Sequence, residues 1–259
     1  MNNCLLRNHE GDFCKPLSPI YIGLHGANGH GGRVAASNTP ADYHGLLLAD
    51  SPAREGQAKV YDVLGSYVKS FSKQFADVKA DLVGAGKSDN EIRVKSLYLW
   101  SEAPGTGKTT SAVALLNEYL VAHYIGHLKR KEMPAQRPCY FLDANLLQTE
   151  YNAFNRPRVP DDIAEPASRR YYNAIERGKH TEFVVIDDLA TRDATDAFRA
   201  DLHSVINHRV TNQLPTIFTS NIPISELANV FGEQRLADRV GDMCMELHFK
   251  GESKRGMRK

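Results

Sequence analysis

The sequence predicts an α/β domain with a mainly parallel five-stranded sheet. Apolar runs of strand length recur along the chain, and longer amphipathic patterns typical of helices separate them, which is the order found in parallel sheets. A hydrophobic share of 42% over 259 residues is sufficient for one sizeable core. The runs expected to form strands are 96–100, 139–142, 183–186, 216–219 and 245–249.

Helices are expected between these runs and ahead of the first one. Ser51-Pro52 opens a helical pattern that reaches about Val83, with Ser51 as the cap and Pro52 at the first helical position. The stretch 143–182 is mostly helical by pattern and is broken by prolines near its middle. Further apolar faces at helical spacing are formed by Val113, Leu116, Leu120 and Tyr124 and by Phe198, Leu202, Val205, Ile206 and Val210.

Residues 1–50 differ in composition from the rest of the chain. The run 23–33 is too glycine-rich for an internal helix or strand, so residues 1–50 are interpreted as a small partner-binding module ahead of a main domain at 51–259. Five residues of this module are of zinc-binding types, but their spacing is not that of a zinc finger or ribbon. A glycine-rich loop docked on a partner or on the main domain is favoured over a zinc site. The zinc candidates are Cys4, His9, Cys14, His25 and His30.

Composition excludes several classes of protein. No apolar run approaches the ~18 residues of a membrane span, and the first residues lack the apolar core of a signal peptide. The cysteines are scattered, so reduced thiols are expected, and the protein is predicted to be cytoplasmic with no membrane partner. The net charge of +1 neither demands nor excludes nucleic acid. Cations crowd the end of the chain, either as a solvated tail or as a phosphate contact: Lys250, Lys254, Arg255, Arg258 and Lys259.

The run 102–109, Glu-Ala-Pro-Gly-Thr-Gly-Lys-Thr, is the most informative motif. It lies between a predicted strand and a predicted helix, which is the context of a P-loop that binds nucleotide phosphates. Lys108 would reach the β- and γ-phosphates, and the Thr109 hydroxyl would hold Mg²⁺. Glu102 replaces the first glycine of the pattern and adds a negative charge near the phosphates. A simple glycine-rich turn is the less favoured alternative. The expected nucleotide contacts are Glu102, Ala103, Pro104, Gly105, Thr106, Gly107, Lys108, Thr109 and Thr110.

Two carboxylates directly follow the apolar run 183–186. Asp187 and Asp188 then occupy the Walker B position, at the carboxyl end of a strand expected beside the P-loop strand. Asp187 would coordinate Mg²⁺, and Asp188 would orient or activate the attacking water. The alternative is a strand-to-helix turn in which one carboxylate caps a helix.

Further polar groups complete a predicted catalytic set. Asn221 follows the strand 216–219 and could bind the water beside the γ-phosphate, a role compatible with an Asx turn. Arg235 and Arg239 share one helical face. A neighbouring subunit could use Arg239, with Arg235 as second choice, to neutralise the γ-phosphate, and a solvated helix face is the alternative. Arg255 is a candidate for contact with the nucleotide of its own chain.

With these motifs in this order, the chain resembles the AAA+ ATPases of the DnaC/DnaI-type replicative-helicase loaders, with the IstB-like transposition helpers as close relatives. The resemblance covers about residues 50–259, and phage-encoded loaders share this compact form. The stretch after Asn221 is too short for the multi-helix lid of most AAA+ motors, so the lid would be vestigial. The resemblance rests on the runs 104–109, 185–189, 219–223 and 233–239.

The resemblance implies a function. ATP bound between subunits would promote a homo-oligomer that holds single-stranded DNA, and the N-terminal region would grip a hexameric DnaB-type helicase and release it on hydrolysis. Hydrolysis by the isolated protein should be weak, and stimulated by DNA or the helicase, because Asp188 is shorter than the glutamate of many AAA+ proteins. An IstB-like regulator of a DNA transposase is the alternative. A module that uses ATP only to fix its shape is a third hypothesis.

The resemblance also places a DNA-contacting insertion after the second strand, within about residues 146–158. Aromatic and cationic side chains occur together there, and single strands are usually bound by base stacking and phosphate neutralisation. The alternative is a surface helix with a proline-rich exit. The candidate DNA contacts are Tyr151, Phe154, Asn155, Arg156 and Arg158.

Overall fold

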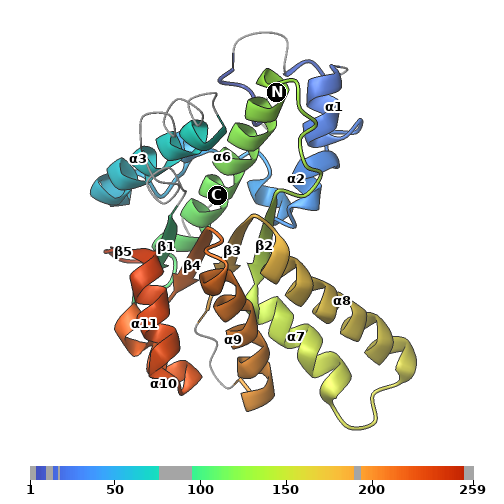
Figure 1. The fold of residues 1–259 in the computed structure, drawn as a ribbon, viewed down its shortest axis with the longest axis vertical. Helices are drawn as coiled ribbons and strands as arrows, with labels where there is room; N and C mark the ends of the chain where they lie inside the picture. The colour runs from blue at the N-terminus through green and yellow to red at the C-terminus, as the bar shows by residue number, and fades with distance from the viewer. Residues whose placement is uncertain (1–3, 10–13, 17, 76–94, 190–193, 254–259) are drawn as a thin grey trace.

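The computed structural model describes residues 4–9, 14–16, 18–75, 95–189 and 194–253. At its centre is a five-stranded sheet with the order β2-β3-β4-β1-β5, in which all neighbouring strands are parallel (Figure 1). The predicted α/β class is therefore confirmed. The strands are β1 (Ser96–Trp100), β2 (Cys139–Asp143), β3 (Phe183–Asp187), β4 (Thr216–Ser220) and β5 (Cys244–His248).

Helices precede the sheet and connect its strands. Short 3-10 turns lie at Ala41–Tyr43, Leu48–Asp50, Glu55–Gln57 and Ile224–Glu226. The helices before β2 are α1 (Pro19–His25), α2 (Gly32–Ala36), α3 (Ala58–Phe75) and α6 (Lys108–Lys129). Those after β2 are α7 (Ala144–Asn155), α8 (Asp161–His180), α9 (Asp196–Thr211), α10 (Leu227–Phe231) and α11 (Gln234–Met243).

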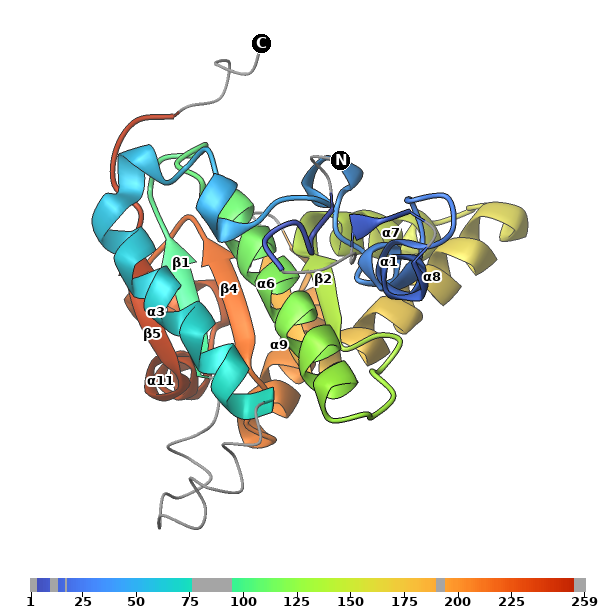
Figure 2. The ribbon, with the colours of Figure 1, turned by 90° about the horizontal axis from the view of Figure 1, so that it is seen from above.

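Alternate residues of each strand cover opposite faces of the sheet. Leu97 and Leu99 of β1 join a core beneath α3, α6 and the N-terminal segment, whereas Tyr98 joins a second core beneath α7, α8, α9 and α11. Successive side chains of a strand point to opposite faces, so a parallel sheet covered on both sides is apolar on both. Figure 2 shows α3 and α6 on the same side of the sheet. Of the helices described, none is sufficiently long and apolar to cross a bilayer.

The described part of residues 4–50 packs against α6 and β2 and shares a core with them. The buried guanidinium of Arg33 donates to the carbonyl oxygens of residues 134 and 135, both at 2.8 Å. The backbone amide of Phe141, on the outer edge of β2, donates to the Ser37 carbonyl at 2.8 Å. The segment therefore covers a sheet edge that would otherwise present unpaired backbone groups. A domain boundary at residue 50 and a partner for this segment stay predictions.

The glycine-rich run 23–33 contains helix ends, because α1 finishes at His25 and α2 begins at Gly32. The expectation that this run forms no helix is thus wrong at both of its ends. Gly32 has φ of 62°, and a Cβ there would lie 2.5 Å from the Leu24 carbonyl oxygen. Glycine is needed at this position because the two short helices meet backbone to backbone.

The helix expected from Ser51 begins later, at Ala58. Ser51 does not cap it, because the Ser51 hydroxyl bonds the Tyr61 hydroxyl, which in turn lies 2.7 Å from the Ser111 hydroxyl of α6. Residues 52–57 consequently cross the start of α6 before α3 begins. The expected end at Val83 lies outside the described residues.

Candidate nucleotide-binding site

The P-loop forms the turn between β1 and α6, as predicted. Gly105 and Gly107 have φ of 74° and 101°, in the left-handed region that favours glycine. A Cβ on Gly107 would also lie 2.3 Å from the Ala53 Cβ. Gly107 is the N-cap of α6, so the loop leads directly into a helix N-terminus, where unpaired backbone amides favour anions.

The lysine of the motif is buried and meets the predicted polar residue of β4. The Lys108 ammonium donates to the Asn221 Oδ1 at 3.0 Å and to the carbonyl oxygens of Ser101 and Ala103, both at 3.3 Å. Only 6% of Lys108 is exposed. These oxygens lie around the ammonium at the place where phosphate oxygens would compete for it.

The carboxylate of Asp187 lies beside the threonine of the P-loop. The Thr109 hydroxyl donates to Asp187 Oδ1 at 2.9 Å, and the Thr219 hydroxyl donates to the same oxygen at 2.6 Å. Burial raises the pKa of Asp187 to about 6, and the nearby Asp188 charge adds to the effect. The role of Thr219 was missed in the sequence, although its position before Ser220-Asn221 on a strand was a signal.

The strand order corrects one expectation. The Walker B strand β3 is not beside β1, because β4 lies between them. This insertion brings Thr219 next to Asp187 and Asn221 next to Lys108, so β4 supplies a polar contact to each side of the site. The order could not be read from strand patterns, since these do not encode which strands are neighbours.

Asp188 follows the strand in a left-handed conformation, with φ of 55°. Its backbone amide donates to the Thr219 hydroxyl at 2.9 Å, and its Oδ2 accepts a hydrogen bond from the Asn145 side chain at 3.0 Å. Asn145 lies in the first turn of α7, directly after β2. Sequence reasoning missed Asn145, because the pairing links residues on two different strand–helix connections.

The Glu102 side chain turns toward β5 and does not line the cavity beside the P-loop. Its Oε2 lies 3.0 Å from His248 Nε2 on β5, and the His248 ring stacks on Trp100 with centroids 4.0 Å apart. A backbone hydrogen bond and the contact with His248 hold the pKa of Glu102 below its ordinary value. The expected negative charge beside the phosphates is therefore directed to β5, and the side chain is not part of the cavity.

A cavity of about 590 Å³ lies over these residues. Its wall includes the predicted 104–110, Asp187, Asp188 and Asn221, which the fold brings together. The rest of the lining was not predicted, because its residues come from the segment before α3 and have no motif. These additional residues are Tyr43, Pro52, Ala53 and Glu55.

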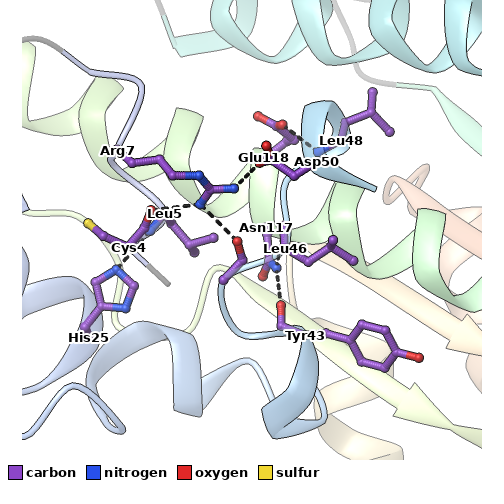
Figure 3. A network of polar contacts seen from close by, with 11 residues as sticks. Cys4, Leu5, Arg7, His25, Tyr43, Leu46, Leu48, Asp50, Asn117 and Glu118 are labelled. Atoms are coloured by element: carbon purple, nitrogen blue, oxygen red, sulfur yellow. Dashed lines mark hydrogen bonds and ion pairs between the residues drawn. The ribbon is translucent and has the colours of Figure 1, made fainter. Parts of the chain in front are cut away.

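Consecutive side chains of α6 hold the segment that contributes Tyr43 to the cavity. The Asn117 amide donates to the carbonyl oxygens of Tyr43 and Leu46, both at 2.8 Å, and the Leu48 amide donates to the Glu118 carboxylate at 3.0 Å (Figure 3). Burial raises the pKa of Glu118. The helix that begins at the P-loop therefore also fixes the position of Tyr43 in the cavity lining.

Arg235 and Arg239 do not reach the cavity of their own chain. Both are exposed on α11, and Arg239 donates through Nη1 to Asn207 Oδ1 on α9. Their roles stay predictions. Arg255 lies outside the described residues.

The predicted DNA-contacting stretch forms most of α7 and its exit. Tyr151 is only 8% exposed, since its ring packs against Phe154, Tyr171 and Phe198. It is therefore a core residue and not a platform for bases. Asn155 donates to the Tyr151 hydroxyl at 3.0 Å. Arg156 and Arg158 are the exposed members of the predicted set that carry charge.

The zinc candidates are not gathered at one place in the part of the chain that the structure describes. In the described ranges, no three histidine, cysteine or acidic side chains converge as metal ligands. The Nε2 of His25 accepts a hydrogen bond from the Leu5 amide at 3.3 Å, and burial lowers the pKa of His25 to about 4. The neutral imidazole of His25 therefore accepts this hydrogen bond and holds the N-terminal segment in place (Figure 3).

The P-loop, a carboxylate pair and a polar strand end meet at the carboxyl ends of the strands of a wholly parallel sheet, which is the arrangement of a P-loop nucleotide-binding fold. Residues 164–259 match the family described as IstB-like ATP binding protein. The replicative helicase loader DnaI of Bacillus subtilis (strain 168) is 26% identical over 186 residues, covering 65% of this chain and 50% of that protein. The chain therefore spans about half the length of this relative.

Solved structures share the fold. The crystal structure of DnaI aligns with a TM-score of 0.51 and 18% identity over 82% of this chain and 95% of that one. The DnaC helicase loader aligns with a TM-score of 0.52 and 18% identity over 82% of this chain and all of that one. These findings confirm the resemblance to the DnaC/DnaI-type loaders and IstB-like proteins among the AAA+ ATPases.

Proposed function

We propose that this chain is an ATPase that loads a replicative helicase of the DnaB type onto single-stranded DNA. The observation that carries the proposal is the sequence match to the DnaI loader. The polar residues at the carboxyl ends of β1, β3 and β4 support it, because loading requires a site that distinguishes bound from hydrolysed nucleotide. Partner, substrate and activity of the whole assembly are parts of this proposal.

The residues at the carboxyl ends of these strands fit ATP with Mg²⁺. Lys108 would leave its carbonyl oxygens for the β- and γ-phosphates, and the amides at the start of α6 would bind phosphate oxygens. The Thr109 hydroxyl and the Asp187 carboxylate, 2.9 Å apart, are oxygen ligands of the kind that Mg²⁺ prefers. When bound, the ion would neutralise charge that develops on the phosphates.

Asp188 and Asn221 would orient the attacking water. Asp188 is hydrogen-bonded to Asn145 and Asn221 to Lys108, so part of the hydrogen-bonding capacity of each group is already used within the chain. This supports weak hydrolysis by the isolated protein, stimulated when DNA or the helicase favours the released arrangement.

Completion of the site requires a neighbouring subunit. The exposed Arg239 of α11, with Arg235 as second choice, would neutralise the γ-phosphate bound by the next copy. Arg156 and Arg158 would contact DNA phosphates, and the N-terminal segment would bind the helicase.

Regulation of a DNA transposase is the second candidate. It is favoured by the match of residues 164–259 to IstB-like ATP binding proteins. This candidate keeps the same ATPase site and changes only the partner.

Association with the replicative helicase from the same host, measured by light scattering after size exclusion, tests the proposal. Wild type is compared with Lys108→Ala and Arg239→Ala, with ATP and with ADP. We expect the wild type to form a complex with the helicase in the presence of ATP, and this complex should loosen on hydrolysis. Lys108→Ala should not form the complex. ATP-driven self-assembly without any helicase contact would contradict loading and favour the transposase regulator.

A further inference from the structure

The exposed arginine of α11 has a defined partner within its own chain. Arg239 donates through Nη1 to the side-chain oxygen of Asn207 on α9. The side chain of Arg235, one turn earlier on α11, forms no hydrogen bond or ion pair with any residue of the described ranges. The two arginines that the sequence left as alternatives therefore differ, since only Arg239 is held by a neighbouring helix.

A second polar contact joins the same two helices. His203 Nε2 lies 2.9 Å from the Glu233 carboxylate, and Glu233 is the N-cap position of α11. His203 and Asn207 are four residues apart, so they lie on one face of α9. The apolar face of α11 is buried beneath these contacts. Figure 1 shows α9 and α11 side by side, and the two contacts together define the direction of α11.

The partner of Arg239 is neutral. An amide oxygen orients a guanidinium without cancelling its charge, whereas a carboxylate would form a bidentate ion pair and compete with a phosphate. The adjacent carboxylate, Asp238, accepts a hydrogen bond from Gln234 at 2.8 Å instead. The full positive charge of Arg239 thus stays available on the surface in a fixed direction.

We propose that Asn207 is a positioning residue for Arg239 and holds the guanidinium ready for the nucleotide of a neighbouring subunit. The inference rests on the proposed trans role of Arg239 and assigns that role to Arg239 rather than Arg235. Asn207 does not touch the nucleotide. It reduces the number of conformations that the long arginine side chain must lose when subunits meet.

Steady-state ATP hydrolysis with saturating DNA and helicase tests the inference, with kcat and KM measured for Asn207→Ala, Asn207→Asp and Asn207→Gln. Asn207→Ala should lower stimulated kcat about five-fold with KM unchanged, because one oriented hydrogen bond is lost. Asn207→Asp should lower kcat more than ten-fold by pairing with the arginine. Asn207→Gln should recover part of the loss. Asn173→Asp, an exposed asparagine on α8, is the control for added negative charge.

The same substitutions in the Arg239→Ala background separate positioning from a structural effect. Asn207→Ala and Asn207→Asp should have no further effect there, and thermal unfolding midpoints should stay at the parent value. Equal losses with and without Arg239, or full kcat for Asn207→Asp, would overturn the positioning role. Full stimulated kcat for Arg239→Ala alone would overturn the trans role of Arg239, and the positioning role with it.

Discussion

The proposed ATPase site has a phosphate half, with Lys108 and Asp187, and an arginine half, with Arg235 and Arg239. The two halves differ in how far a single chain fixes their positions. Lys108 and Asp187 are each 6% exposed, and their polar atoms are hydrogen-bonded to neighbours on β4, on α6 and in the loop that follows β1. Arg235 and Arg239 are exposed on α11, where a single neutral side chain holds Arg239. The phosphate half is thus preformed within the chain, whereas the arginine half is directed outward.

The contrast follows from the cost of burying charge. A buried ammonium or carboxylate needs partners in every state, because an unpaired charge away from water is strongly destabilising. A surface guanidinium needs none, so it can remain available to another molecule. Substitutions in the phosphate half should therefore change the isolated chain, and substitutions in the arginine half should change only the assembly.

The largest effect is expected from Lys108→Ala. Without the ammonium, ATP affinity should fall by at least about 100-fold, because a buried charge-assisted contact to phosphate is lost. Calorimetric titration with ATP and Mg²⁺ measures it. Lys129→Ala, at the exposed other end of the same helix, is the matched control and should bind as wild type. Retained affinity in Lys108→Ala would show that the cavity is not a phosphate site.

Asp187→Asn should stabilise the protein that lacks nucleotide and Mg²⁺. Burial raises the pKa of Asp187 from 3.8 to about 6, so this group contributes stability below pH 3.8 that is lost as pH rises through 6. At pH 7.5 the buried charge costs up to about 3 kcal/mol, which the neutral amide removes. Urea unfolding should show this gain at pH 7.5 and about half of it at pH 5.

Asp242→Asn on the exposed face of α11 is the control for that experiment and should leave the free energy of unfolding unchanged. A gain for Asp187→Asn that does not depend on pH would mean that packing, and not the buried charge, accounts for it.

A smaller effect is expected from Asn145→Ala. Loss of the 3.0 Å hydrogen bond to Asp188 frees this carboxylate to orient water, so unstimulated hydrolysis should rise about three-fold. Phosphate release by the isolated protein measures it, and Asn152→Ala on the same helix is the control. Unstimulated turnover at or below the wild-type rate would mean that Asn145 does not restrain Asp188.

The smallest effect is expected from Glu102→Gly, which restores the usual P-loop residue. Since Glu102 contacts His248 on β5 and not the cavity, ATP affinity should change by less than about two-fold. A large increase in affinity on calorimetric titration would instead show that the carboxylate repels bound phosphates.

The sequence predicted the parts of the fold that local patterns encode. The five strands, the P-loop turn and the two carboxylates after β3 depend on residues that are adjacent in the chain. The position of β4 between β1 and β3 was not predictable, because strand patterns do not specify neighbours. For the same reason Thr219 and Asn145 were missed, since Thr219 contacts Asp187 on β3 and Asn145 contacts Asp188 just after it.

Tertiary packing also gave single residues contacts that their neighbours in the sequence do not predict. The cationic stretch around Tyr151 predicts an exposed aromatic side chain, but three other rings bury it. Ser51-Pro52 reads as a helix start, yet the Ser51 hydroxyl is bonded to Tyr61. Tyr43 has no motif at all and lines the cavity because Asn117 of α6 holds its backbone.

Mixing two variants with reduced turnover is the most direct test of whether the phosphate site is preformed within one chain and the arginine acts on another. Lys108→Ala lacks the phosphate contact but keeps Arg239, whereas Arg239→Ala keeps the phosphate site. Hydrolysis by the mixture is measured with DNA and helicase present, while light scattering verifies mixed assemblies. We predict turnover well above the sum of the two variants measured alone, because the arginine of one serves the ATP of the other. Turnover equal to that sum in verified mixed assemblies would contradict the account.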